Sequence, residues 1–307
     1  MLELAQPYER CVIDVDTAAA EMRRRGARVV VLLGYSGGAS LTALAQAETG
    51  CGDGWVGIAA HPGEGVFMGQ VIDPSVVDES DPFSTDQSLD MYDPANGWQP
   101  WPAPSQYDSD WLIRYRAAQQ ARVARIDAIA HAEMEAGHQA GVALETLTPA
   151  SEAWRQARRR AVHIQYLTIY RTLADPAYLS LSIDPSDRAL GSVFASPDPM
   201  DANWGGFGLG RVMTAGGWLS TWSSLSSKAR LEETISRLSC SRLSCPLLLV
   251  HPTADTEIRL RQVHAIRDAA TSASLSYHEI KGASHYLEGH RQPAMEIVAE
   301  WIRGTLA

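Results

Sequence analysis

The sequence has few cysteines, and they do not form a recognisable motif. Cys11, Cys51, Cys240 and Cys245 are the 4 cysteines of the 307-residue chain. They lack the closely spaced pairs of a zinc site and are too sparse for a disulfide framework. We therefore expect reduced thiols in a cytoplasmic protein, with no metal and no organic cofactor.

Positive charge and long apolar runs are also scarce. The 26 Lys and Arg residues are outnumbered by 36 Asp and Glu residues, which gives a formal net charge of −10. Surfaces that bind nucleic acid or anionic membranes need concentrated positive charge, so neither partner is expected. No apolar run approaches the roughly 20 residues that span a bilayer. The first ten residues do not show the pattern of a signal peptide.

The most informative stretch of the chain is residues 29–40. A short apolar segment bounded by glycines is typical of a strand that is buried on both faces of a parallel sheet. It continues into Gly34-Tyr-Ser-Gly-Gly38, the G-x-S-x-G pattern of a nucleophile elbow, which is a tight strand-to-helix turn. The pattern predicts Ser36 as a nucleophile and the Gly37 N–H as a donor toward developing negative charge.

Helix and strand patterns alternate around this stretch. Helical periodicity predicts helices over residues 8–25, 39–47, 258–270 and 292–306. Short apolar runs predict further strands over residues 55–61, 246–251 and 274–281. This order is typical of right-handed crossover units, so we expect an α/β fold with a mostly parallel, doubly wound sheet.

The middle third of the chain has a different composition. Residues 73–108 are rich in Pro, Asp, Ser and Gly, which predicts a long irregular excursion. Helical periodicity then predicts helices over residues 110–137 and from residue 149 or 150 to residue 173. We therefore expect a core in two parts, residues 1–65 and 239–307, with a mainly helical cap, residues 66–238, inserted between them.

Two features near the end of the predicted cap have competing interpretations. Trp218 and Trp222, together with Tyr35 beside the serine, are candidates to line an apolar substrate pocket. The alternative, in which the tryptophans only pack the cap against the core, is at least as well supported. The glycine-rich stretch 203–210 follows no strand and favours a turn over a dinucleotide-binding loop.

A serine hydroxyl becomes a good nucleophile when a base takes its proton and an acid holds that base in place. Asp255 follows the predicted strand 246–251, and His285 follows the strand 274–281. Because the carboxyl ends of parallel strands meet at one edge of the sheet, Ser36, Asp255 and His285 are expected to converge there.

Other titratable residues are alternatives for these roles. Glu257 could be the acid and His290 the base. Glu64, which follows the predicted strand 55–61, is another acid position, but it would leave Asp255 without a role. His251 and His278 are interpreted as structural histidines on strands.

The sequence resembles the α/β-hydrolase superfamily through Gly34-Tyr-Ser-Gly-Gly38, Pro246-Leu-Leu-Leu-Val-His-Pro-Thr-Ala-Asp255 and Gly282-Ala-Ser-His285. The chain order of serine, aspartate and histidine also matches that family. The resemblance implies Ser36 as nucleophile, His285 as general base and then acid, and Asp255 as the orienting carboxylate. Together with the aromatic residues of the predicted cap, these three residues lead us to expect an esterase-type serine hydrolase that forms an acyl-enzyme from a small ester or thioester with an apolar acyl part. Carbon–carbon bond hydrolysis or acyl transfer with the same residues is the second enzymatic hypothesis.

The sequence departs from this family before the serine. Family members carry several strands ahead of the nucleophile strand, and a loop among them supplies the second oxyanion N–H. Here 35 residues precede Ser36 and predict one helix and one strand, so Val29 to Leu33 are expected at an exposed edge of an abbreviated sheet. A longer natural chain, a homo-oligomer that pairs through this edge, or a reduced fold would each explain the pattern. A non-catalytic binding or assembly module is the hypothesis from another class.

Overall fold

The computed structural model describes residues 7–191, 193, 198–205, 211–240, 244–270 and 275–306. Its central sheet has four parallel strands in the order β1-β2-β7-β8. These strands are β1 (Val31–Tyr35), β2 (Gly54–Ile58), β7 (Leu247–Pro252) and β8 (Leu275–Ile280). The predicted α/β class with a parallel sheet is confirmed.

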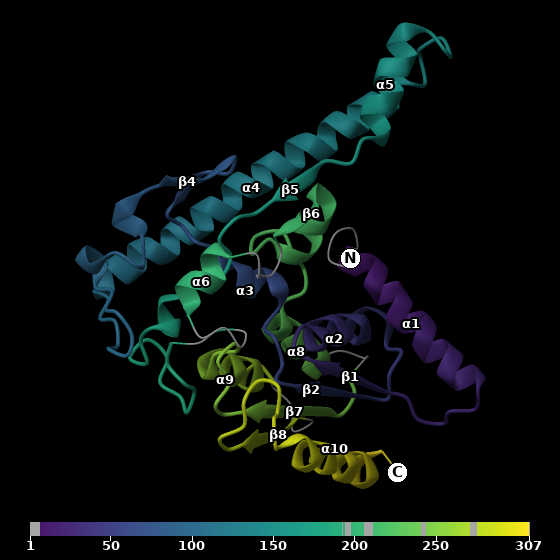
Figure 1. Cartoon of the computed structure of the whole chain (residues 1–307). Helices are drawn as coiled ribbons and strands as arrows, with labels where there is room; N and C mark the ends of the chain where they lie inside the picture. The colour runs from purple at the N-terminus through teal and green to yellow at the C-terminus, as the bar shows by residue number, and fades with distance from the viewer. Residues whose placement is uncertain are drawn as a thin grey trace.

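Helices cover both faces of this sheet (Figure 1). They are α1 (Tyr8–Arg24), α2 (Gly37–Thr49), α8 (Leu231–Cys240), α9 (Leu260–Asp268) and α10 (Arg291–Thr305). On one face Trp55 and Leu249 pack against α1, α2, α8 and α9, and on the other Val56 and Val250 pack against α10. The strands are therefore apolar on both sides, as the continuous hydrophobic runs require.

The strand that leads to Ser36 lies at an edge of the sheet. β1 pairs with β2 on one side, and β1 is the terminal strand in the sheet order. Val29 and Leu33 are each 43% exposed, so this edge presents apolar side chains to solvent. The predicted exposed edge is present in the described part of the chain, and pairing with a second copy stays a prediction.

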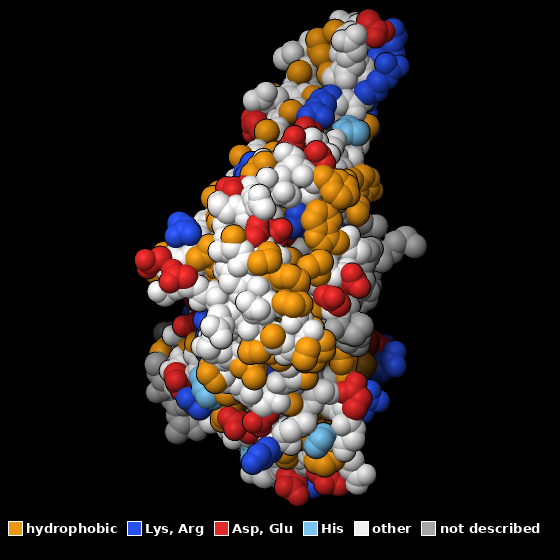
Figure 2. Space-filling view, turned by 60° about the vertical axis from the view of Figure 1, so that its left-hand side comes forward, with side chains coloured by type: hydrophobic (Ala, Val, Ile, Leu, Met, Phe, Trp, Pro, Cys, Tyr) orange, Lys and Arg blue, Asp and Glu red, His pale blue; other side chains and the backbone are white. Residues whose placement is uncertain are grey.

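A long insertion separates β2 from α8. Its α-helices, strands and one π-helical turn are α3 (Glu64–Val71), β3 (Val76–Asp78), β4 (Asp81–Thr85), α4 (Ser109–Ala143), α5 (Glu152–Val162), β5 (Tyr166–Thr168), α6 (Pro199–Trp204), β6 (Val212–Thr214), α7 (Ala215–Gly217) and the π-helical η5 (Trp218–Trp222). Three short 3-10 helices, η2 (Gln87–Leu89), η3 (Pro94–Asn96) and η4 (Pro176–Tyr178), lie between them. The far end of α4 and the whole of α5 project from the body as an arm (Figure 1). Arginine side chains lie near the tip of this arm (Figure 2).

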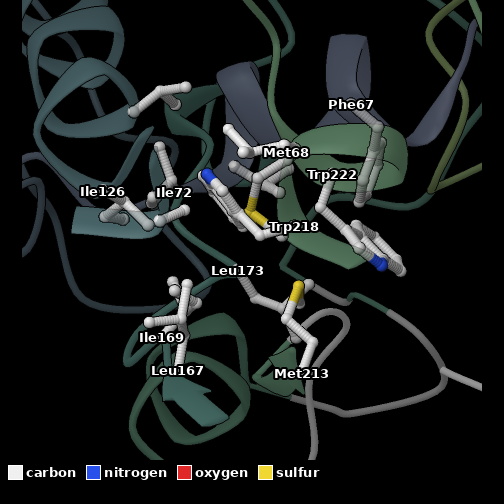
Figure 3. Close-up of a cluster of buried hydrophobic side chains, with 14 of the residues drawn as sticks. Phe67, Met68, Ile72, Ile126, Leu167, Ile169, Leu173, Met213, Trp218 and Trp222 are labelled. Carbon is white, nitrogen blue, oxygen red and sulfur yellow. The ribbon is translucent and has the colours of Figure 1, made fainter. Parts of the chain in front are cut away.

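The insertion has its own hydrophobic cluster, which begins directly after β2. Phe67 and Met68 of α3 pack there with Ile126 of α4 and with Trp218 and Trp222 of η5 (Figure 3). This cluster is separate from the two clusters on the faces of the sheet. The insertion therefore begins with α3, directly after the loop that follows β2, and has an interior of its own.

One predicted helix is wrong over its second half. The helix predicted to end at residue 173 ends at Val162, and residues 166–168 form β5, which pairs antiparallel with β6. Ile164, which lies between α5 and β5, is 57% exposed. The segment is rich in β-branched and aromatic residues, which suit a strand once a partner strand is available. That partner lies far along the chain, so local periodicity does not reveal it.

Other sequence predictions have clearer outcomes. The helix predicted over residues 110–137 is present as the longer α4, which has 35 residues. Of the glycine-rich stretch 203–210, residues 206–210 lie outside the described part of the chain. None of the described helices, α4 included, is apolar enough over a sufficient length to cross a membrane.

Candidate active site

Three loops at the carboxyl edge of the sheet bring Ser36, Asp255 and His285 together. The loops follow β1, β7 and β8 respectively. Nδ1 of His285 lies 2.8 Å from Oδ2 of Asp255, and Nε2 lies 3.1 Å from Oγ of Ser36. The imidazole thus bridges the carboxylate and the hydroxyl, an arrangement in which Nε2 can accept the serine proton.

The backbone at Ser36 is strained and is held by hydrogen bonds. Ser36 has φ 51° and ψ −125°, a region uncommon for a residue with a Cβ. Its N–H donates to the carbonyl of Ile58 at 3.0 Å, and its own carbonyl accepts from the N–H groups of Ala39 at 3.0 Å and His61 at 3.1 Å. Strain of this kind persists where surrounding contacts enforce it, and it is concentrated at functional sites.

The two glycines that flank Ser36 have different roles. A Cβ on Gly34 would lie 2.3 Å from the carbonyl oxygen of Gly38 and 2.4 Å from Cα of Ala39. Both atoms belong to the backbone, so no side-chain rotation relieves the clash. A Cβ on Gly38 would meet no atom within 4 Å. The close approach of β1 to α2 therefore depends on Gly34 and not on Gly38.

Replacing Gly34 with alanine is expected to destabilise the protein by about 3 kcal/mol or more, because the backbone must move to admit the methyl group. Gly38→Ala is the matched control, and its effect is expected within about 1 kcal/mol. Urea unfolding followed by circular dichroism measures both values. Equal effects of the two substitutions would contradict this account of the turn.

The charges around His285 favour its protonated form. Burial alone would lower the pKa of His285, but the hydrogen bond and charge of Asp255, with smaller contributions from Glu257 and Glu288, raise it above the ordinary value of 6.5. Oδ1 of Asp255 accepts from the N–H groups of Glu257 at 2.8 Å and Ile258 at 2.9 Å. The carboxylate is thus fixed by its own turn while its other oxygen orients the imidazole.

Glu64 lies against the first turn of α2. Its Oε2 accepts a hydrogen bond from the Ser40 hydroxyl at 3.1 Å, and a Cβ on Gly37 would lie 2.3 Å from its Oε1. Burial raises the pKa of Glu64 to about 7, although hydrogen bonds from Tyr8 and Ser40 oppose the rise. Glu64 is therefore engaged at the elbow, and Asp255 is the carboxylate that hydrogen-bonds the imidazole.

The remaining candidate histidines make other contacts. Among the described residues, His285 is the histidine whose ring hydrogen-bonds Ser36. His290 precedes α10, and its Nδ1 lies 3.0 Å from the backbone carbonyl of Glu288. His251 is buried in β7, and His278 is exposed on β8.

The aromatic candidates separate into two groups. Tyr35 lies beside His285, with ring centroids 5.6 Å apart, and its hydroxyl donates to the His285 backbone carbonyl. Trp218 is fully buried in the cluster of the insertion, and its Nε1 donates to Asp127 at 2.6 Å. Trp222 is 6% exposed in the same cluster. Both tryptophans therefore pack within the cluster of the insertion, and a part for them in a substrate pocket stays a prediction.

Comparison with known proteins identifies the fold. No protein-family model and no curated protein matches the sequence. Among solved structures, the alpha/beta hydrolase GrgF from Penicillium sp. sh18 aligns over 98% of this chain and 73% of its own, with 11% identity and a TM-score of 0.50. This chain has an α/β-hydrolase fold.

Two further solved structures align over a similar share of the α/β-hydrolase chain. The esterase domain of a Rhodothermus marinus protein covers 99% of this chain and 71% of its own, with 10% identity and a TM-score of 0.43. The Paleococcus ferrophilus monoacylglycerol lipase covers 97% of this chain and 75% of its own, with 12% identity and a TM-score of 0.43.

The α/β-hydrolase core places a second carboxyl group beside the imidazole. Oε2 of Glu257 lies 3.8 Å from Nε2 of His285, and the Glu257 side chain is 3% exposed. Asp255 holds Nδ1, so Glu257 faces the nitrogen that also faces Ser36. The sequence offers Glu257 only as an alternative to Asp255, because spacing along a turn does not tell which imidazole nitrogen a carboxyl approaches.

The insertion of this chain is tied to the loop that carries Asp255. Nη2 of the buried Arg259 lies 3.2 Å from Oδ2 of Asp175, which also pairs with Arg116 of α4 at 2.6 Å. Burial alone would raise the pKa of Asp175, but the charges of Arg116 and Arg259 hold it well below the ordinary range. The two ion pairs of Asp175 therefore connect α4 to the segment between β7 and α9, which carries Asp255.

Proposed function

We propose that this chain is a serine hydrolase that cleaves an ester or thioester by way of an acyl-enzyme on Ser36. One observation carries the proposal: His285 lies within hydrogen-bond distance of both Ser36 Oγ, at 3.1 Å, and Asp255 Oδ2, at 2.8 Å. The α/β-hydrolase fold supports it, because the chain order of these three residues is the order used in that fold.

In the proposed reaction Ser36 receives the acyl group of the substrate, and His285 carries the proton. Ser36 Oγ attacks the carbonyl carbon while Nε2 of His285 takes the serine proton. The bond to the leaving alcohol or thiol then breaks, and Nε2 gives that proton to the leaving atom. Water then attacks the acyl-enzyme while Nε2 of His285 takes a proton from the water. Nε2 returns this proton to Ser36 Oγ, which releases the acid and restores the Ser36 hydroxyl.

The insertion supports the assignment of a cap. We propose the insertion between β2 and α8 as this cap, because Asp175 within it pairs with Arg259, four positions after Asp255 in the core. The range 66–238 expected from the sequence extends into α8, which packs on the sheet. We further propose a small-molecule substrate with an apolar acyl part. The three side chains supply the nucleophile, the base and the orienting acid, so the reaction needs no metal or organic cofactor.

Labelling with a fluorophosphonate probe tests the proposed function. The probe is expected to add to Ser36, and peptide mass spectrometry locates the labelled residue. In His285→Ala the rate of labelling is expected to fall by about 1,000-fold or more. In the parent the rate is expected to rise with pH through a midpoint above 6.5, because the raised pKa keeps His285 protonated below it and only the neutral imidazole can accept the proton.

A folded parent protein that the probe does not label would refute the proposed function. Labelling that persists unchanged in His285→Ala would equally count against it, because the serine would then react without its base. Circular dichroism spectra of both proteins show that the comparison is made on folded samples.

A further inference from the structure

Glu257 occupies a place that the proposed mechanism does not use. It lies on the turn after β7, and the hydrogen bond from its N–H to Asp255 fixes its backbone. Its carboxyl group approaches Nε2 of His285 to 3.8 Å, on the far side of the imidazole from the Asp255 carboxylate. A carboxyl group that orients the base must bind Nδ1, so Glu257 has a different role.

One oxygen of this carboxyl group is buried without a partner. Oε1 of Glu257 has no hydrogen-bond partner among the described residues, and the side chain is 3% exposed. The Tyr286 hydroxyl interacts with the same carboxyl group and opposes the rise of its pKa, but it leaves this oxygen unpaired. An unpaired buried carboxyl oxygen is costly because it loses the hydrogen bonds that water would supply. A substrate group that donates a hydrogen bond to this oxygen would remove that cost.

The position of Nε2 indicates which part of a substrate would reach Glu257. The leaving atom must come within about 3 Å of Nε2 to take the proton. The other oxygen of the Glu257 carboxyl group, Oε2, lies 3.8 Å from the same nitrogen, so the carboxyl group as a whole is close to the substituents of the leaving group and not to the acyl part. The neighbouring charges and titratable groups are those of His285, Asp255, Arg259, Tyr286, Tyr35 and Tyr178.

We propose that Glu257 is a specificity-determining residue that binds a hydroxyl group on the leaving alcohol, one or two carbons from the scissile oxygen. This inference rests on the proposed function and names the class of substrate: an ester of a diol or other polyol. A hydroxyl group both donates and accepts hydrogen bonds, so it suits the carboxyl group in either protonation state. An ammonium group only donates hydrogen bonds and would require Glu257 to be ionised. An ether oxygen only accepts them and would require Glu257 to be protonated.

Both protonation states of Glu257 are relevant near neutral pH. Burial raises the pKa of Glu257 to about 7, with the charge of Asp255 acting in the same direction and His285 opposing. The group therefore accepts a hydrogen bond above this pH and is able to donate one below it. A hydroxyl ligand is compatible with the whole range, which favours it over ligands of fixed polarity.

Three butanoate esters of matched size test this inference: the 2-hydroxyethyl, 2-methoxyethyl and propyl esters. In the parent protein kcat/KM is expected to be about tenfold or more higher for 2-hydroxyethyl than for 2-methoxyethyl butanoate, since a hydrogen bond to a buried charged group is lost with the methyl cap. In Glu257→Met this ratio is expected to fall to about one. Glu288→Gln, which changes an exposed carboxyl group that His285 also senses, is the matched control and should keep the parent ratio.

Glu257→Gln separates hydrogen bonding from charge. Its amide still accepts and donates, so most of the preference for the hydroxyl ester is expected to remain. The midpoint of the acid limb of kcat/KM is expected to move to lower pH, because the Glu257 charge no longer raises the pKa of His285. A purely structural role for Glu257 would not move this midpoint.

The outcomes distinguish this inference from the proposed function. Turnover of all three esters with the same ratio in the parent and in Glu257→Met would overturn the inference alone, as would a parent that does not prefer the hydroxyl ester. Absence of any turnover, together with absence of probe labelling at Ser36, would overturn both. Because the removed carboxyl oxygen is buried without a partner, Glu257→Met is expected to melt no lower than the parent, and Glu257→Leu replaces it if it does not fold.

Discussion

Replacing Ser36 with alanine is expected to lower kcat for short p-nitrophenyl esters by about 10,000-fold or more. The substitution removes the atom that attacks the carbonyl carbon, and the 3.1 Å contact between Ser36 Oγ and Nε2 of His285 leaves no second hydroxyl in that position. Residual hydrolysis would come from water activated by His285. Release of p-nitrophenol, followed by absorbance under saturating substrate, measures the change.

Ser284→Ala provides the matched control for this loss. Ser284 precedes His285 in the chain, and its hydroxyl donates to Glu288 and not to Ser36, Asp255 or the His285 ring. Its removal is expected to change kcat by no more than about twofold, as is usual for a surface hydrogen bond. If Ser36→Ala kept the activity of the parent, the acyl-enzyme mechanism would be excluded. If both variants lost activity equally, the loss would reflect the loop and not the nucleophile.

The sequence predicts the elements around the candidate site well because each depends on local signals. The apolar runs that end at Tyr35 and Pro252 are short and bounded by turn residues, and buried parallel strands have that pattern. Once the strands are parallel, the residues that follow them meet at one edge of the sheet. The approach of Ser36 to His285 therefore follows from the order of elements, although no local pattern contains both residues.

The motif around Ser36 shows where sequence reasoning loses detail. In the G-x-S-x-G pattern Gly34 and Gly38 are equivalent, but only Gly34 faces backbone atoms that exclude a side chain. The difference arises from the packing of β1 against the start of α2. The sequence motif does not tell which of the two glycines contacts backbone atoms, whereas the distances in the structure do.

The insertion was harder to predict because its structure depends on distant contacts. Tyr166–Thr168 form a strand through pairing with Val212–Thr214, which overrides the helical periodicity that precedes them. The sequence leaves open whether Trp218 lines a pocket or packs in the interior, because the hydrogen bond from its indole N–H to the buried Asp127 of α4 joins residues far apart in the chain. The contact between Glu257 and Nε2 of His285 also depends on distant parts of the chain. The loops after β7 and β8 together determine which side of the imidazole Glu257 faces.

Asp255→Asn is expected to lower kcat by about 10,000-fold while the turn after β7 keeps its structure. The Asn oxygen can still accept the N–H groups of Glu257 and Ile258, as Oδ1 of Asp255 does at 2.8 and 2.9 Å. Its amide NH₂ would then face Nδ1 of His285 and donate to it. This fixes the tautomer with the proton on Nε2, which is unable to accept the Ser36 proton.

The same assay and probe labelling measure this effect, with Asp187→Asn as control. Asp187 lies in the insertion and accepts a hydrogen bond from Thr253, close to the same turn, at 2.7 Å. An Asn oxygen can also accept that bond, so kcat is expected to stay within about twofold of the parent. Because Glu257 keeps its carboxyl group in Asp255→Asn, a loss of less than about tenfold would show that Glu257 can replace Asp255. The full loss would instead show that a carboxyl group must bind Nδ1, which Glu257 does not reach from the opposite side of the ring.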